Sequence, residues 1–190
     1  MSAPVLHVLA GPNGSGKSTF VARVLQPVTH LPFVNADEIA AERWPGEELE
    51  HAYQASRAAA DLRRRMLARG ESFITETVFS HQSKVALVTQ AVALGYLVNL
   101  HVMLVPADLA VARVAERVRR GGHQVPEEKI RQRYARLLTH VVAARAMSDR
   151  STFYDNSRAK VPFRIVAAYE RGRLVGEADW PAWTPTVLTR

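Results

Sequence analysis

The sequence predicts an α/β fold, a mainly parallel sheet flanked by helices, and three observations lead to this prediction. Apolar runs alternate with helix-like patterns along most of the chain, as in βαβ units. A glycine-rich segment, residues 11–18, fits the phosphate-binding pattern G-x-x-x-x-G-K-[ST] and lies between an apolar run and a helical pattern. The length of 190 residues suits one domain with one core. We therefore expect a single P-loop NTPase domain over residues 1–190.

The first half of the chain alternates short apolar runs with helical segments. The expected elements are a strand over residues 5–10, a helix after the loop, a strand over 33–35, a helix around 39–44 and a long helix over 47–69. Asp37 could cap the helix that follows the second strand, and Pro45 with Gly46 would end it. The long helix is rich in alanine and has Gly70 as its stop.

The second half continues the alternation and then changes character. The expected elements are a strand over residues 72–77, a helix over 82–94, a strand over 96–105, a helix from 108 to about 120 and a helix over 127–147. Gly121 and Gly122 break the pattern between the last two helices, and Pro126 starts the second of them. The tail predicts short strands at 152–154, 163–169 and 174–175, the last two joined as a hairpin around Gly172.

Composition narrows the chemistry that the chain can perform. The absence of cysteine excludes disulfides, thiolate zinc sites and a cysteine nucleophile. No apolar run approaches membrane-spanning length, and no signal peptide precedes the first strand, so we expect a cytoplasmic protein without membrane contact. The formal charge is +7, and seven of the arginines fall between Arg113 and Arg136. This segment, with its central glycine pair, predicts a helical lid over about residues 113–136.

The glycine-rich loop predicts an ATP site. Glycines let the backbone N–H groups turn toward a phosphate, and the N-terminus of the next helix adds positive potential. Lys17 would reach the terminal phosphates, and the Ser18 hydroxyl would bind Mg²⁺. The expected ATP-binding residues are Gly11, Asn13, Gly14, Ser15, Gly16, Lys17, Ser18 and Thr19.

Asp37 comes two residues after the second predicted strand, where a parallel sheet presents its ligand. There it could accept the proton of an acceptor hydroxyl or orient that hydroxyl during in-line transfer. The alternative is that Asp37 serves only as a helix N-cap, a position that aspartate often fills. Both interpretations follow from its position.

Glu76 ends a predicted strand, where a carboxylate can hold Mg²⁺ or bind a sugar hydroxyl. Its alternative is a solvent-facing strand end, or an ion pair with one of the many arginines. Thr77 and Ser80 follow it and are weaker candidates for hydrogen bonds to the substrate. Together these residues predict the acceptor side of the cleft.

The lid carries cations on both of its arms. Phosphoryl transfer spreads negative charge over the moving group, and arginines delivered by a closing lid can neutralise that charge. We expect Arg120, Arg133 or both to act on phosphate, although Arg119 and Arg131 could replace them. The alternative for each arginine is a surface ion pair with a glutamate at short helical spacing.

Assembled, these residues resemble the zeta-toxin family of P-loop kinases, in particular its short members. The matching segments, in family order, are residues 11–19, 35–37, 76–80, 121–126, 130–136 and 154–157. The resemblance implies ATP and Mg²⁺ as cofactors, Lys17 and Ser18 on the triphosphate and metal, Asp37 as the base, and Glu76 with Thr77 near a sugar. It also implies Arg120 and Arg133 as the lid arginines, UDP-N-acetylglucosamine as a typical acceptor and a small antitoxin protein as a possible partner.

The resulting expectation is a kinase that uses ATP and Mg²⁺ to phosphorylate a hydroxyl of a sugar or nucleotide-sugar. The chain departs from the large toxins in being shorter and in having Glu76-Thr77-Val78 where they carry a longer substrate motif. One alternative is a nucleic-acid-end kinase or repair-type ATPase, suggested by the basic surplus. The arginines cluster by the lid and not in a nucleic-acid module with aromatic platforms, which argues against it. Another alternative is a non-catalytic protein that binds ATP and acts by association.

Overall fold

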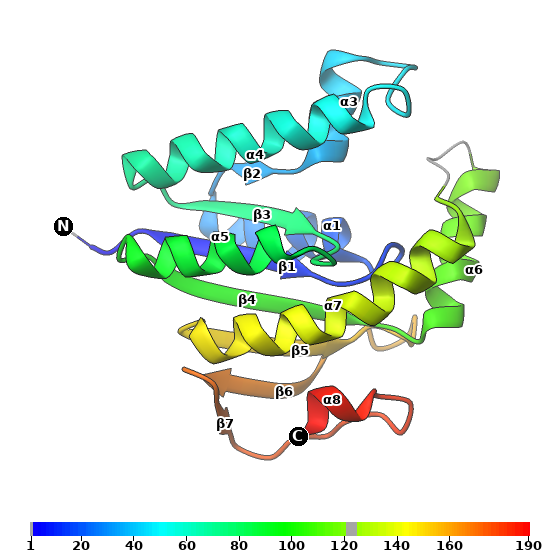
Figure 1. Cartoon of the computed structure of the whole chain (residues 1–190). Helices are drawn as coiled ribbons and strands as arrows, with labels where there is room; N and C mark the ends of the chain where they lie inside the picture. Colours follow the sequence, from blue (N-terminus) through cyan, green and yellow to red (C-terminus); the bar gives the residue numbers. More distant parts are fainter. Residues whose placement is uncertain (1, 121–124) are drawn as a thin grey trace.

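The computed structural model describes residues 2–120 and 125–190, and its centre is a seven-stranded sheet in the order β2-β3-β1-β4-β5-β6-β7 (Figure 1). The strands are β1 (Val5–Ala10), β2 (Phe33–Val34), β3 (Phe73–Thr77), β4 (Leu97–Leu104), β5 (Arg150–Asp155), β6 (Arg164–Glu170) and β7 (Arg173–Val175). From β2 to β5 all neighbours are parallel, while β6 and β7 pair antiparallel. The expected mainly parallel sheet with a C-terminal hairpin is confirmed.

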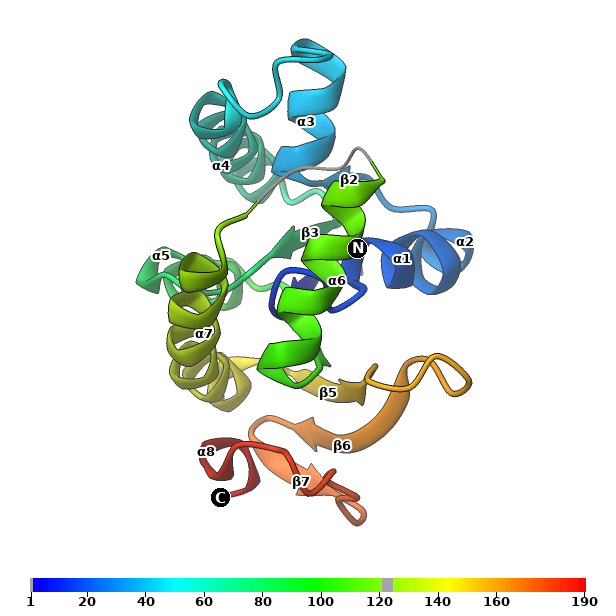
Figure 2. The same ribbon diagram turned by 90° about the vertical axis from the view of Figure 1, so that its right-hand side faces the viewer.

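Helices connect the parallel strands and cover both faces of the sheet. They are α1 (Lys17–Phe20), η1 (Val21–Leu25), α2 (Gln26–Thr29), α3 (Ala36–Arg43), α4 (Ala52–Arg69), α5 (Gln82–Ala93), α6 (Ala107–Arg119), α7 (Glu127–Met147) and α8 (Thr186–Thr189). Figure 2 shows α5 and α7 on one side of the sheet, α1 and α2 on the other, and α6 across its carboxyl end. Of the lid, the Gly121-Gly122 break and His123 lie outside the described residues.

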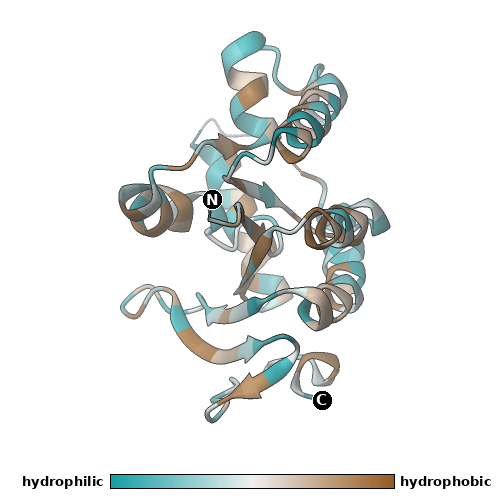
Figure 3. Ribbon diagram, turned by 90° about the vertical axis from the view of Figure 1, so that its left-hand side faces the viewer, coloured by the Kyte–Doolittle hydropathy of each residue, from teal (hydrophilic) through white to brown (hydrophobic). Residues whose placement is uncertain are grey.

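The sheet centre is apolar because β1 is enclosed on both faces. In its sequence VLHVLA, Leu6, Val8 and Ala10 join the core under α5 and α7, whereas Leu9 packs with Phe20 of α1. Strands that are buried on both faces lack a simple polar alternation, which is why β1 reads as a nearly continuous apolar run. The central strands are mostly hydrophobic in Figure 3, and the surrounding helices are mixed.

The long helix α4 begins at Ala52, five residues later than its composition predicts. Residues 44–51 form successive turns instead, with Glu47 N donating to Trp44 O at 3.0 Å and Glu50 N donating to Glu47 O at 3.1 Å. Gly46 adopts a left-handed φ of 89°, and Leu49 is 59% exposed, so no buried face holds this segment in a helix. Isolated helical turns without tertiary packing are marginal in water.

The last fifteen residues, which carry no strong sequence signal, pack against the sheet. Asp179 N donates to Val166 O at 2.8 Å, Trp180 meets Phe153 edge-on, and Leu188 in α8 is fully buried. Arg145 of α7 donates to the Leu188 carbonyl at 3.0 Å. This segment therefore closes the core beside β5 and β6. Within the described ranges, no helix has both the length and the apolar character needed to cross a membrane.

Candidate active site

The glycine-rich loop between β1 and α1 has a conformation that only glycine tolerates well. Gly14 and Gly16 have left-handed φ values of 75° and 91°. A Cβ on Gly16 would lie 2.4 Å from the Asn156 Nδ2 atom, which itself donates to the Ser15 carbonyl at 2.8 Å. The Asn13 Oδ1 and Ser15 Oγ atoms are buried without a hydrogen-bond partner in the described part of the chain. A tight cradle with unsatisfied polar atoms suits the phosphates of a nucleotide.

Lys17 lies inside this loop and is only 5% exposed. Its Nζ donates to the Pro12 carbonyl at 2.9 Å and lies 3.6 Å from Glu76 Oε1. Burial lowers the pKa of Lys17, while the charges of Glu76 and Asp37 oppose that shift. The ammonium is thus held at the cradle by two acidic groups, and a phosphate there would favour its charged form.

Glu76, at the end of β3, is the point where the predicted site residues meet. Its Oε2 accepts hydrogen bonds from Ser18 Oγ at 2.7 Å and from Asn35 Nδ2 at 3.1 Å. A hydroxyl and a carboxylate are the hard oxygen ligands that Mg²⁺ prefers, usually with water and substrate phosphates completing its shell. The described residues contain no group of three or more histidine or acidic side chains placed to hold a metal. The pair Ser18 and Glu76 therefore fits a magnesium ion shared with a nucleotide.

Asn35, which the sequence prediction left without a role, caps helix α3 in place of Asp37. Its Oδ1 accepts from the Asp37 backbone N–H at 2.8 Å, and Asp37 lies in the first turn with an exposed side chain. The N-cap alternative for Asp37 is therefore wrong. Partial burial, with the charges of Glu76 and Asp37, raises the pKa of neighbouring Glu38. Glu76 and Asp37 thus act on the charge of Lys17, and neither carboxylate caps helix α3.

Thr77 and Ser80 lie in the turn that leads from β3 to α5. Thr77 Oγ1 accepts from the Phe79 backbone N–H at 3.1 Å, so its hydroxyl stabilises the turn. Phe79 is fully buried with a left-handed φ of 65°, a strained conformation that its packing maintains. Ser80 is half-buried. The turn holds these side chains at the carboxyl end of β3.

The predicted lid arginines are placed differently from one another. Arg120 is 78% exposed and its Nε lies 2.8 Å from Glu116 Oε1, while Arg119 pairs with the same glutamate. Arg131 lies 2.8 Å from both Asp108 and Glu127, and these hydrogen bonds raise its pKa. Arg133 is half-buried and makes no hydrogen bond or ion pair within residues 2–120 and 125–190. In this conformation Arg120 is directed to Glu116 and not to the loop.

Two other arginines of α6 face the loop and were not predicted. Arg113 Nη1 donates to the Gly14 carbonyl at 3.4 Å, and the charge of Arg117 contributes to lowering the pKa of Lys17. They lie one turn apart on the face that also carries buried Ala110 and Val114. That apolar stripe was the signal that could have identified them. Arg113 in the middle of α6 and Arg117 in its last turn therefore add positive potential near the loop.

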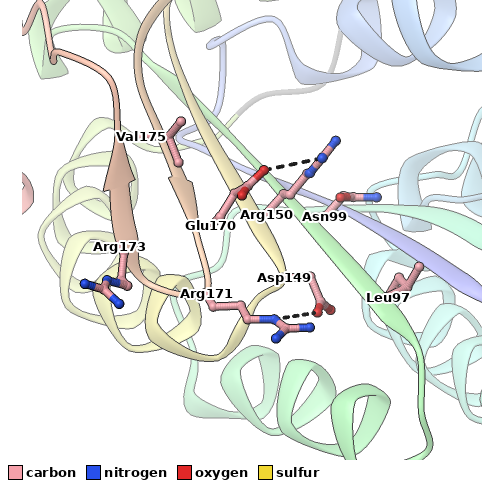
Figure 4. Close-up of a pocket in the computed structure, with 8 residues that line it drawn as sticks. All are labelled: Leu97, Asn99, Asp149, Arg150, Glu170, Arg171, Arg173 and Val175. Carbon is pink, nitrogen blue, oxygen red and sulfur yellow. Dashed lines mark ion pairs between the residues drawn. The ribbon is translucent and has the colours of Figure 1, made fainter.

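A hollow of about 650 Å³ lies at the opposite edge of the sheet (Figure 4). It is lined from β4, β5, β6 and β7, near Leu97 and Arg150, with which β4 and β5 begin. Its charges pair with one another, Arg150 with Glu170 at 3.3 Å and Arg171 with Asp149 at 3.7 Å. Ligands of parallel sheets bind beyond the carboxyl ends of the strands, so the candidate active site is the loop edge and not this hollow.

Comparison with known proteins agrees with this geometry. The sequence matches the family described as AAA domain over residues 6–139. A structure from the PezAT chromosomal toxin-antitoxin system of Streptococcus pneumoniae superposes with a TM-score of 0.62 at 15% identity, covering 87% of this chain and 72% of that chain. No match was found among curated proteins.

Two further structures show the range of proteins with this fold. Shikimate kinase from Acinetobacter baumannii, in complex with shikimate, gives a TM-score of 0.52 at 18% identity and covers 82% of this chain and 86% of that chain. A chain of the Pnkp1/Rnl/Hen1 RNA repair complex gives 0.58 at 18% identity, with 90% of this chain and 49% of that chain covered. The expected zeta-toxin-like P-loop kinase fold is confirmed.

Proposed function

This chain belongs to the AAA domain family, and from that premise and its P-loop kinase fold we propose that it is an ATP-dependent phosphotransferase. The acceptor is a hydroxyl of a small molecule, of the sugar or nucleotide-sugar class that UDP-N-acetylglucosamine exemplifies. One observation carries the proposal. Glu76 contacts Lys17 and Ser18 of the loop and Asn35 at the start of α3, so donor and acceptor elements converge on one carboxylate.

The donor side consists of the loop and its bracing residues. Lys17 and the backbone N–H groups of the loop would bind the triphosphate, and Ser18 with Glu76 would hold Mg²⁺. When bound, the Mg·ATP complex supplies the phosphoryl group and offsets part of its negative charge. Arg113 and Arg117 of α6 add positive potential there, and Arg133 has a guanidinium without an ion pair in the described chain. These groups stabilise charge that develops on the moving phosphoryl group.

The acceptor side begins at Asp37. Because its backbone N–H is held by Asn35 and its carboxylate is exposed beside the cradle, Asp37 can orient an acceptor hydroxyl and take up its proton. The acceptor oxygen forms a bond to the γ-phosphorus, the bond to the leaving ADP oxygen breaks, and the acceptor proton goes to Asp37.

The test is incubation with labelled ATP and Mg²⁺ against UDP-sugars, free amino sugars, nucleosides and oligonucleotides. We expect Lys17→Ala to abolish transfer, and Asp37→Asn to lower kcat about 10²- to 10⁴-fold with ATP affinity unchanged. Glu42→Gln, on exposed α3 surface, is the matched control and should retain activity. Unchanged transfer by both Lys17→Ala and Asp37→Asn would refute the mechanism.

A second candidate acceptor is a nucleic-acid end. The net charge of +7 and the fold similarity to a chain of an RNA repair complex favour it. Transfer to oligonucleotides alone, with affinity that falls steeply as salt rises, would support this candidate. Transfer to UDP-sugars alone would refute it. A folded protein that binds ATP and transfers to no acceptor, yet changes its affinity for an antitoxin-like partner, would instead favour a non-catalytic role.

A further inference from the structure

Arg63 is a buried arginine that has no acidic partner among the described residues. It lies in the middle of α4, is 6% exposed, and makes one polar contact, from Nη1 to Thr75 Oγ1 at 3.4 Å. The Thr75 hydroxyl donates its own proton to Val34 O at 3.0 Å and so can only accept from Arg63. Burial lowers the pKa of Arg63, and no carboxylate counters the shift. Buried arginines are normally paired, because an uncompensated charge in the interior is costly.

Lys84, at the start of α5, is a second cation, and its charge interacts with that of Arg63. It is half-buried, and both its burial and the positive charge of Arg63 lower its pKa. Its side-chain ammonium makes no ion pair or hydrogen bond with any residue in 2–120 or 125–190. By contrast, Arg64 and Arg69 of the same helix pair with Asp61 and Glu71. Among the described residues, neither the Arg63 guanidinium nor the Lys84 ammonium therefore has an anionic partner.

Arg63 packs against β3, the strand that carries Glu76. Thr75, which Arg63 contacts, directly precedes Glu76, and α4 and α5 lie on the same side of the sheet next to β3 (Figures 1 and 2). The glycine-rich loop and α1 cover the other face of the sheet, where Glu76 meets Ser18. The donor phosphates have their own cations there. The anion that completes Arg63 and Lys84 is therefore a separate group.

We propose that Arg63 and Lys84 form an anion subsite for the phosphoryl acceptor, which carries a carboxylate or phosphate group in addition to its reactive hydroxyl. A planar guanidinium and an ammonium suit either oxyanion. Anchoring the acceptor at this subsite would leave its other end toward Asp37. The identity of the acceptor rests on the proposed function, whereas anion binding by the two cations does not.

The first experiment measures anion binding by itself. The protein, with Mg²⁺ and a non-hydrolysable ATP analogue filling the donor site, is titrated calorimetrically with inorganic phosphate and separately with malonate. We expect at least one anion to bind, and Arg63→Met or Lys84→Met to weaken binding about tenfold or more. Arg65→Met, exposed on the same helix, is the matched control and should bind as wild type. No binding to wild type, or equal binding by the two subsite variants, would overturn the proposal.

Thermal melting distinguishes a binding role from a structural one. Because Arg63→Met removes an uncompensated buried charge, its melting temperature without anion should equal or exceed that of wild type. Added phosphate should raise the melting temperature of wild type and leave that of Arg63→Met unchanged. If Arg63→Met does not fold, Arg63→Lys, which retains a cation, and Lys84→Met carry the same comparison. A lower melting temperature in every variant, with anion binding retained, would assign Arg63 to packing.

The same titration on Lys17→Ala separates this inference from the proposed function. If the wild type and Lys17→Ala both bind the anion and neither transfers phosphate to any acceptor, the proposed anion subsite is supported and the proposed kinase function is refuted. In active protein, the ratio of kcat/KM for glucose 6-phosphate over glucose, and for glucuronate over glucose, identifies which anion is preferred. At least one ratio should be about tenfold or more in wild type and near one in Arg63→Met. Ratios near one in wild type would overturn the assignment of the subsite to the acceptor.

Discussion

At the scale of single residues, His101 should make the protein sensitive to acid. Its Nε2 lies 3.0 Å from His7 Nδ1, its Nδ1 lies 3.2 Å from the Tyr154 hydroxyl, and burial lowers its pKa to about 3. The unfolded histidine takes up a proton near pH 6.5, so between that pH and about 3 the unfolded state binds more protons. The stability that neutral His101 contributes is present above pH 6.5 and is lost as the pH falls through this window.

We therefore expect the wild-type free energy of unfolding to drop by about 2 kcal/mol between pH 6.5 and 5 because of His101. Urea unfolding at the two pH values measures it. His101→Gln, which cannot take up this proton, should show a smaller drop, and His140→Gln serves as the control. An equal loss in His101→Gln would show that other groups cause the acid sensitivity.

At the residue scale, position along the sequence indicates which side chains lie close together, whereas it does not indicate how they are oriented. The closeness of Ser18 and Glu76 follows from their places beside strand ends, and their roles in the site stay predictions. Asn35 and Asp37 are both typical N-cap residues two positions apart, and only the hydrogen bond from Asp37 N to Asn35 separates their roles. Arg63 sits in a run of three arginines, and the rotation of α4 alone buries the first of them. Arg63 follows Ala55 and Ala59 at intervals of four residues and so lies on the same buried face of α4. This spacing is visible in the sequence.

At the scale of elements, the loop after β5 braces the glycine-rich loop. Asn156 Nδ2 donates to Ser15 O at 2.8 Å, and Asn156 Oδ1 accepts from Phe163 N at 3.3 Å. Asn156→Ala leaves both backbone groups without this partner and opens space beside Gly16. Since an unsatisfied buried group costs about 1–3 kcal/mol, we expect ATP affinity to fall about tenfold.

Titration of the protein with ATP checks this expectation. Asn99→Ala, in the hollow at the opposite edge of the sheet, is the control for a general loss of stability. Wild-type affinity in Asn156→Ala would mean that the glycine-rich loop keeps its shape unaided. Ser15 and Asn156 are 141 residues apart in the sequence, so no local sequence pattern could predict the hydrogen bond between them.

At the scale of the whole molecule, the C-terminal segment lies beyond the residues that match the family and completes the hydrophobic core. The match ends at residue 139, whereas fully buried Leu188 contacts the cluster that includes Phe153 and Val141. Leu188→Ala should lower the free energy of unfolding by about 2–5 kcal/mol, because it leaves a cavity in a packed core. Urea denaturation measures the change. Val187→Ala, 40% exposed, should cost much less, and equal losses would contradict the closing role of Leu188.

The overall architecture was more predictable than these tail contacts. The alternation of strands and helices predicted the parallel sheet because each strand, loop and helix is local in sequence. The segment from 176 to 190 has one turn at residues 182–183, the short helix α8 and one fully buried leucine, so its place depends on a surface that the rest of the chain forms first. The predicted start of α4 at residue 47 was wrong for the same reason, because residues 47–51 have no surface to pack against.

The shared carboxylate of Glu76 has a consequence for the kinetic order of the reaction. One oxygen of this side chain accepts from Ser18 and from Asn35, so a change in its charge state or position on one side is felt on the other. ATP and acceptor should therefore bind with a coupling free energy, each altering the affinity of the other by the same factor. Initial-rate plots at several fixed acceptor concentrations should give intersecting lines, as for a ternary complex. Parallel lines would indicate that the two substrates never occupy the site together.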